Sequence, residues 1–203
     1  MSDTTQSNLR YDSNETPGTD ANDRHAIQTY LSDALALERH IAAPLARQLE
    51  IDDSAKYSEA LRIISTIKGL TDSHVSALSA QLDASGGHAA SPIKSAWSQL
   101  LGAGAAAIDG ARKTKVSKNL RDDYTALALA TISYTMLHAT ALGLGDTATA
   151  ALAKRHLDDY APCIVEIAKA MPLVVLEELR DDGENVQIGA AELSERVTQD
   201  AWK

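Results

Sequence analysis

Hydrophobic residues recur along this chain at intervals of three and four positions, the spacing that places them on one face of an α-helix. The pattern first appears in residues 25–49, where an apolar stripe is interrupted by one acidic residue, Glu38. It returns in residues 55–82, and this second stripe carries His74. Because only a short acidic turn separates the two segments, they predict an antiparallel helical hairpin.

A second pair of helical segments follows in the C-terminal half. Residues 122–142 are apolar nearly all round, which predicts the most buried helix of the fold. Residues 148–171 carry a narrower apolar stripe, and Pro172 predicts an end or a kink, after which the helical pattern continues briefly to Leu179. A Gly-Leu-Gly-Asp turn before residue 148 ends one helix and caps the next, so these segments predict a second hairpin.

The two predicted hairpins are separated by a connection that spans residues 87–121. It contains a short helical pattern, a Gly/Ala-rich piece and a basic run, interpreted as a solvated linker, with a polyanion-binding patch as the alternative. The basic residues of this run are Arg112, Lys113, Lys115, Lys118 and Arg121. Two hairpins joined by one long crossover predict an all-α four-helix bundle over residues 25–179, rather than a simple up-down-up-down bundle.

Both ends of the chain differ from the predicted bundle. Residues 1–24 are polar and cannot bury enough apolar area to offset their chain entropy, so we expect a disordered tail, with a docking or targeting peptide as the alternative. Residues 180–203 include a short amphipathic segment. Its apolar residues Leu193, Val197 and Trp202 are expected to pack back on the bundle.

Composition supports a helical protein and narrows its partners. Hydrophobic residues make up 44% of the 203 residues, but aromatic residues only 4% with no Phe, which favours helices over a β-sandwich. The net charge of −9 argues against nucleic acid or an anionic membrane as the main partner. A single cysteine, Cys163, excludes an intramolecular disulfide framework. Without a recognisable signal peptide or membrane span, the expected location is cytoplasmic.

Four residues are candidates for metal binding: Glu38, His74, His156 and Asp159. An unpaired charge inside a bundle costs several kcal/mol, so a charged residue on an apolar stripe needs a reason to be there. A complete di-metal site takes a Glu from each of two helices and a Glu-x-x-His motif from each of the other two. Thr71 stands where the second helix would need its Glu, and the third helix has no carboxylate between Asp123 and Asp146. The alternative is that His74 is a hydrogen-bonded core residue.

Hairpin geometry gives a further expectation for each pair of helices. Folding the first hairpin about Asp52 places His74 about 12 Å along the helix from Glu38, too far for both to bind one metal. Folding the second hairpin about Gly145 brings two pairs of polar residues together, namely Tyr134 with His156 and Thr131 with Asp159. The spacing also places four fourth-helix residues on one face that is expected to meet solvent: His156, Asp159, Cys163 and Glu166.

Three segments carry a resemblance to a known superfamily: residues 30–38 (YLSDALALE), residues 70–78 (LTDSHVSAL) and residues 134–146. Over residues 26–171 the chain resembles the ferritin-like superfamily, and most of all the bacterial stress-associated ferritin-like proteins of the YciF and YciE type. The resemblance implies a ferritin-like fold, with Glu38 as the first-helix ligand and Asp158–Asp159 as the fourth-helix acids. Where such proteins carry Glu and His on the third helix, this chain has Leu127, Ala128 and Ala130.

These observations lead to one expected function and two alternatives. The expectation is a ferritin-like bundle with a degenerate or absent di-metal site, no cofactor and a non-enzymatic stress-related or binding role. The first alternative is a protein that binds iron, manganese or zinc through the four candidate residues and supports redox or storage chemistry. The second is a helical protein-interaction module. Because ferritin-like hairpins often pair across a two-fold axis, a homodimer is expected.

Overall fold

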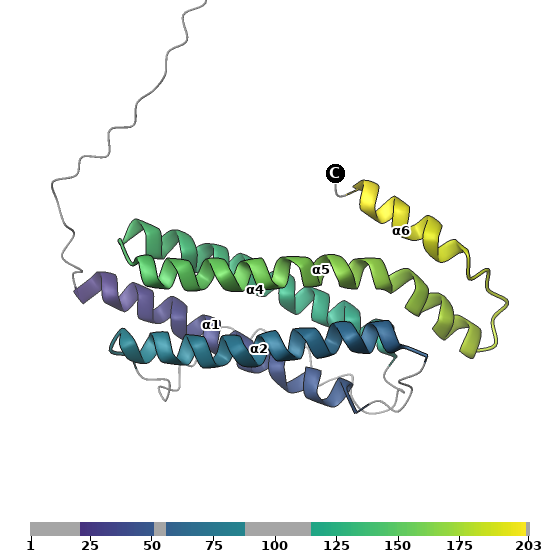
Figure 1. Cartoon of the computed structure of the whole chain (residues 1–203), viewed down its shortest axis with the longest axis horizontal. Helices are drawn as coiled ribbons and strands as arrows, with labels where there is room; N and C mark the ends of the chain where they lie inside the picture. Colours follow the sequence, from purple (N-terminus) through teal and green to yellow (C-terminus); the bar gives the residue numbers. More distant parts are fainter. Residues whose placement is uncertain (1–20, 51–55, 88–114, 202–203) are drawn as a thin grey trace, which may run out of the picture.

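A computed structural model describes residues 21–50, 56–87 and 115–201, and every regular element within these ranges is an α-helix. The helices are α1 (Ala21–Gln48), α2 (Ser58–Ala84), α4 (Val116–Gly143), α5 (Thr147–Asp181) and α6 (Ala190–Ala201) (Figure 1). This confirms the predicted all-α bundle with a short C-terminal helix. Most of the predicted tail and most of the predicted crossover lie outside the described residues.

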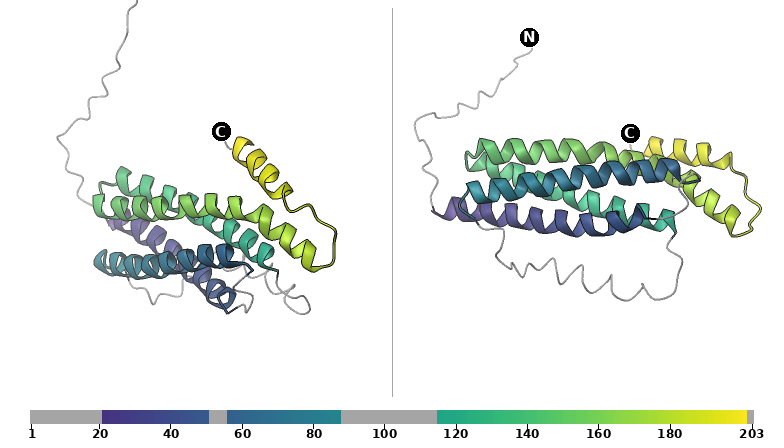
Figure 2. Two further views of the ribbon diagram at one scale, coloured as in Figure 1. Left: turned by 45° about the vertical axis from the view of Figure 1, so that its right-hand side comes forward. Right: turned by 60° about the horizontal axis from the view of Figure 1, so that its bottom comes forward.

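The four long helices form a bundle in which each helix packs antiparallel to both of its neighbours, in the order α1, α2, α5, α4 (Figures 1 and 2). At one end Gln28 Nε2 donates to Ser85 O at 2.7 Å, which joins the start of α1 to the end of α2. At the other end Gln48 Nε2 donates to Asp123 Oδ1 at 3.0 Å, which joins α1 to α4. Since α2 and α4 run in the same direction, the chain crosses the length of the bundle between them.

The core of the bundle is built from aliphatic side chains on the facing stripes, including Leu31, Leu45, Ile64, Ile67, Leu78, Leu127 and Leu137, all fully buried. The turn between α4 and α5 follows the sequence prediction. The Asp146 side chain accepts from Thr149 N at 2.9 Å and so caps α5. Pro172 lies inside α5, which continues to Asp181, so the helical pattern predicted as far as Leu179 is confirmed.

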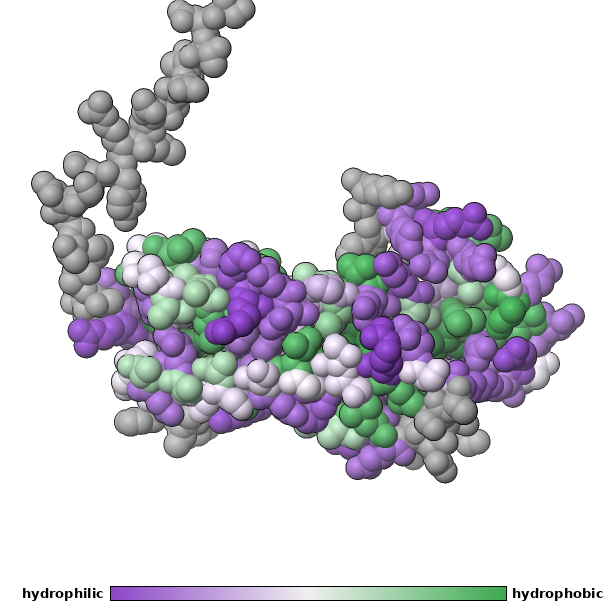
Figure 3. Space-filling view, viewed as in Figure 1, coloured by the Kyte–Doolittle hydropathy of each residue, from purple (hydrophilic) through white to green (hydrophobic). Residues whose placement is uncertain are grey.

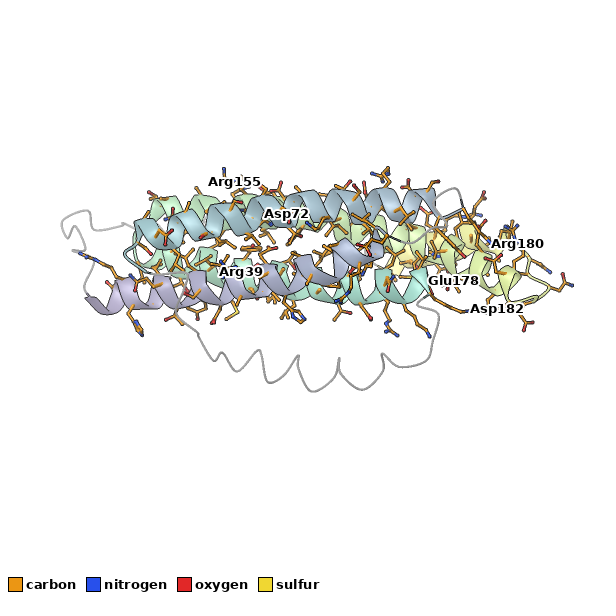
Figure 4. All side chains as sticks on the ribbon, turned by 90° about the horizontal axis from the view of Figure 1, so that it is seen from below. Arg39, Asp72, Arg155, Glu178, Arg180 and Asp182 are labelled. Atoms are coloured by element: carbon orange, nitrogen blue, oxygen red, sulfur yellow. The ribbon has the colours of Figure 1, made fainter. Side chains whose placement is uncertain are left out.

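The helix α4 begins at Val116, earlier than the predicted start near residue 122. Val116 and Leu120 are buried and extend the apolar stripe towards the start of the helix. Glu178 of α5 holds this first turn, because its carboxylate accepts from Ser117 N at 2.9 Å and from Ser117 Oγ at 2.5 Å. Figure 4 shows Glu178 at this end of the bundle, close to Asp182 and Arg180. The end of the basic run therefore lies on α4.

Apolar residues run nearly all round α4, but its outer face is exposed. Ile132, Met136 and Leu142 are 55%, 48% and 57% exposed, because α4 packs only one face against its neighbours. By length and composition α4 is the one helix among the described residues that could span a membrane. A core helix of a bundle meets the same criteria, and the opposite face of α4 contributes Leu127, Tyr134 and Leu137 to the core.

The short helix α6 lies on the α5 side of the bundle, and its apolar face points away from it. Leu193 and Val197 are 60% and 70% exposed, so their predicted packing on the bundle is wrong, and Trp202 lies outside the described residues. A groove of about 600 Å³ separates α6 from α4 and α5. The residues of α6 that line it are small: Ala190, Ser194 and Thr198. Apolar side chains gather where α5 and α6 meet (Figure 3).

Candidate functional site

A buried carboxylate, Glu38, lies in the middle of the bundle and is only 1% exposed. The Tyr134 hydroxyl of α4 donates to Glu38 Oε1, and the Tyr160 hydroxyl of α5 donates to Glu38 Oε2 at 2.5 Å. His74 Nδ1 of α2 lies 3.2 Å from Glu38 Oε1. Each of the other three long helices therefore supplies one polar group to this carboxylate, which faces inward as its position on the apolar stripe predicts.

His74 connects Glu38 to a second carboxylate. The ring is 1% exposed, and its Nε2 lies 3.1 Å from Asp159 Oδ2 on α5. In its doubly protonated form the imidazole donates to both carboxylates, one from each ring nitrogen. The two carboxylates lie on opposite edges of the ring. Because the Asp159 side chain is 36% exposed, this chain of contacts runs from the centre of the bundle to its surface.

His156 stacks on His74, with ring centroids 3.8 Å apart and planes inclined by 12°. Tyr134 meets the His156 ring edge to face, with centroids 5.0 Å apart. Burial, and to a smaller extent the neighbouring His74, lowers the pKa of His156 to about 3. His156 is therefore neutral at neutral pH. Its Nδ1 is buried and has no hydrogen-bond partner in the described structure.

The two tyrosines are held as hydrogen-bond donors. Burial, together with the nearby Glu38 charge, raises the pKa of Tyr134 and of Tyr160 far above the usual range, so both phenols stay protonated. The Thr71 hydroxyl lies 2.8 Å from Tyr160 Oη and 2.8 Å from Ile67 O. Thr71 thus supports Tyr160 from the neighbouring helix α2.

The first hairpin brings Glu38 and His74 into direct contact, so the predicted separation of about 12 Å is wrong. The cause is the register of the hairpin. Gln28 pairs with Ser85 at the far end, and Glu38 pairs with His74. The midpoint of these pairs along the chain lies about four residues after Asp52, the midpoint that was assumed in the prediction. The connection between the two helices is asymmetric about Asp52. The helix α1 ends at Gln48, whereas α2 begins only at Ser58, further from Asp52 along the chain.

The expected solvent-facing surface on α5 is wrong for two of its four residues. His156 and Cys163 are 2% and 5% exposed, because the apolar stripe of α5 is wide enough to include both. Asp159 and Glu166 are both partly exposed, and Glu166 accepts from Arg62 at 3.1 Å.

Among the predicted polar contacts in the second hairpin, that of Tyr134 with His156 is confirmed. Thr131, predicted near Asp159, instead donates to Ala128 O at 2.8 Å.

The sequence pattern did not reveal the roles of Tyr160 and Thr71, which lie on apolar stripes and appear there as packing residues. One signal was present. The chain has no Phe, so each aromatic residue on these stripes carries a polar atom that needs a partner when buried. A tyrosine at the level of a buried carboxylate is therefore a candidate donor.

The cluster has residue types that bind metals, but its geometry does not fit a metal ion. Both nitrogens of His74 and both oxygens of Glu38 already contact protein partners. Tyr134 and His74 both approach the same oxygen of Glu38, Oε1. Across residues 21–50, 56–87 and 115–201, no group of three or more His, Cys, Asp or Glu side chains is arranged to hold a metal ion.

The sequence matches no protein-family model and has no significant match among curated proteins. Two solved structures are similar in fold. A protein from Xanthomonas campestris pv. campestris is 18% identical, with a TM-score of 0.63 over 80% of this chain and 99% of that chain. Antigen TpF1 from Treponema pallidum is 13% identical, with a TM-score of 0.62 over 77% of this chain and 99% of that chain. At these identities the similarity concerns the fold alone.

Proposed function

We propose that this protein is a ferritin-like bundle in which a hydrogen-bonded network occupies the centre of the fold without a metal, and that it acts as a non-enzymatic binding protein. The observation that carries the proposal is that Glu38 and His74 have all of their oxygens and ring nitrogens in contact with protein groups. The single long crossover between two hairpins supports the ferritin-like assignment.

The network explains why a carboxylate is stable at this position without a cation. A buried charge is costly unless hydrogen bonds replace its hydration. Glu38 has two phenols and one imidazole for this purpose, and each comes from a different helix. A metal that bound Glu38 would have to displace at least one of these groups, and the displaced phenol would lose its acceptor inside the core.

The experiment that tests this proposal is metal titration of the full chain purified without chelator. Elemental analysis and calorimetry with Fe²⁺ under argon, Mn²⁺ and Zn²⁺ should show no stoichiometric binding, and EDTA should leave the thermal unfolding midpoint unchanged. In the double variant Tyr134→Phe/Tyr160→Phe, two of the donors to Glu38 are removed. We expect metal affinity to appear or rise in that variant, since the carboxylate then needs another partner.

A second function is favoured by one observation: the four candidate residues Glu38, His74, His156 and Asp159 do converge in one cluster, and His156 Nδ1 has no partner there. The alternative is a metal-binding protein that rearranges this cluster around its ion. Stoichiometric metal in the wild type that is lost in Glu38→Ala but kept in Glu166→Ala, a partly exposed carboxylate on α5, would establish the alternative and contradict the main proposal.

A further inference from the structure

The helix α4 carries two hydrophobic seams on opposite faces. The inner seam runs through Leu120, Asp123, Leu127, Ala130, Tyr134, Leu137 and Ala141, all buried, at alternating steps of three and four. The outer seam runs through Leu129, Ile132, Met136, Ala139 and Gly143 at the same alternating steps. This spacing is the heptad pattern by which one helix packs along another. Ile132 and Met136, at the centre of the outer seam, are about half exposed.

The outer seam lies on a part of the chain that carries no Asp, Glu, Lys or Arg. This uncharged stretch extends from Tyr124 to Gly145. The whole chain has a net charge of −9, so two copies that approach each other generally repel. On the outer seam they can meet without bringing carboxylates together. The same lack of charge gives a strongly charged partner nothing to pair with.

The seam is complementary to itself when two copies run antiparallel. With a two-fold axis at the level of Tyr134, Ile132 of one copy faces Met136 of the other. The same symmetry places Leu129 opposite Ala139, a large side chain against a small one. A parallel arrangement would place identical residues opposite each other, with two glycines at one end and two leucines at the other. Antiparallel packing also places the two helix dipoles in opposite directions, an arrangement in which they attract each other.

We propose that the outer seam of α4 is an isologous interface with a second copy of this chain, in which the two α4 helices pack antiparallel. The inference is independent of metal content and of the network around Glu38. The seam is about four turns long, and a standard stable interface buries about 800 Å² per partner. We expect a seam of this length to bury less than this standard area, and therefore expect a dimer that dissociates on dilution.

The test is the concentration dependence of the molar mass of the full chain, measured by sedimentation equilibrium. The wild type should dimerise. Ile132→Glu and Met136→Lys should each weaken the dimer, by roughly a hundredfold, because each places a charge in an apolar interface. Both sites are exposed in one copy, so circular dichroism should show unchanged helix content. Leu193→Glu, on the exposed apolar face of α6, is the matched control and should leave the dimer intact.

The double variant Ile132→Glu/Met136→Lys decides the orientation. In the antiparallel arrangement each Glu faces a Lys of the other copy, so the double variant should recover most of the affinity that either single variant loses. In a parallel arrangement like charges meet, and no recovery occurs. A wild type that stays monomeric, or a dimer that is broken by Leu193→Glu and not by Ile132→Glu, overturns the proposal. So does Ile132-dependent flotation of a monomeric chain with phosphatidylcholine vesicles, which would indicate a membrane as the partner of this face.

Discussion

Glu38 and Asp123 are two of the three carboxylates buried in the described bundle, the third being Glu178, and the protein accommodates these two in different ways. Glu38, in the middle, is 1% exposed and has three polar groups around its oxygens. Asp123, on the first part of α4, is 4% exposed and accepts one hydrogen bond, from Gln48. Its Oδ2 has no partner in the described structure, and neither does Gln48 Oε1 nor Asn119 Nδ2. Burial is nearly equal at the two positions, but hydrogen bonding is not.

The consequence appears in the charge state. Burial raises the pKa of Asp123 to about 6, and the single hydrogen bond from Gln48 offsets only part of this effect. A proton on Asp123 Oδ2 would turn this oxygen into a hydrogen-bond donor. The Gln48 side chain, which Asp123 already contacts, has an acceptor without a partner, Oε1. Glu38 has three polar partners in its surroundings, whereas Asp123 has one donor, Gln48. The number of donors nearby, rather than burial alone, distinguishes the two sites.

The strongest way to break this comparison is to remove the better satisfied carboxylate. Glu38→Ala leaves both phenols without their acceptor and opens a cavity beside His74. We expect the free energy of unfolding to fall by about 3–5 kcal/mol. Urea denaturation at neutral pH measures this loss.

Glu166→Ala, at a partly exposed carboxylate of α5, is the control for Glu38→Ala and should change stability by less than about 0.5 kcal/mol. Glu38→Gln keeps the shape of the side chain and one acceptor oxygen, so its loss should be intermediate. If Glu38→Ala proved no more costly than Glu166→Ala, the network would contribute no net stability.

The opposite sign is expected at Asp123. Its folded-state pKa lies above that of the unfolded chain, about 4, so the unfolded chain ionises first as pH rises. This group therefore lowers stability progressively between about pH 4 and pH 6. Each pKa unit is worth about 1.4 kcal/mol, so Asp123→Asn should raise stability at pH 7 by about 1–3 kcal/mol and change little at pH 4. Denaturation at the two pH values compares the variant with the wild type.

An Asp123→Asn variant that lost stability at pH 7 would show that the folded protein favours the ionised carboxylate. Asp122→Asn is the matched control, because Asp122 is the exposed neighbour of Asp123 and its carboxylate accepts from Arg121. That substitution should have only a small effect at either pH, since an exposed ion pair contributes little to stability.

Sequence patterns predicted the helices and the inward position of Glu38, because one acidic residue interrupted an otherwise apolar stripe. They did not predict the register that joins Glu38 to His74. Register depends on the whole turn between α1 and α2, and an asymmetric turn moves the pairing by several residues without altering either stripe. The same limit applies to His156, since a stripe slightly wider than expected carries it from solvent into the core.

The amphipathic pattern of α6 shows a further limit of sequence reasoning. A pattern identifies the apolar face of a helix but not the surface that the face meets. Leu193 and Val197 form a clear apolar stripe, yet the small residues on another face line the groove beside α5. Small side chains allow a helix to approach closely, and periodicity weighs them less than Leu or Val. The two seams of α4 lead to the same conclusion, because only one of them lies inside this bundle.

Burial lowers the pKa of His156, whereas it raises the pKa of Asp123, so the two groups change stability with pH in opposite directions. The folded-state pKa of about 3 lies below the unfolded value of about 6.5, so acid favours the unfolded chain, which gains the proton first. His156 thus lowers stability as pH falls from about 6.5 towards 3, by about 2 kcal/mol at pH 5. His156→Phe keeps an aromatic ring against His74 and removes this titration. At pH 5 we expect the variant to exceed the wild type by that amount, with a smaller difference at pH 7.

Because Asp123 and His156 act in opposite directions between pH 4 and pH 6, the wild type should show a weaker pH dependence there than either single variant. In Asp123→Asn, stability should fall as the pH is lowered, because only His156 still titrates. In His156→Phe, stability should rise as the pH is lowered, because only Asp123 still titrates. The double variant should again be nearly flat, and His40→Gln, at an exposed histidine of α1, should match the wild type. Equal slopes in both single variants would mean that neither group titrates as its surroundings indicate. The number of hydrogen-bond donors around a buried group would then not determine its charge state.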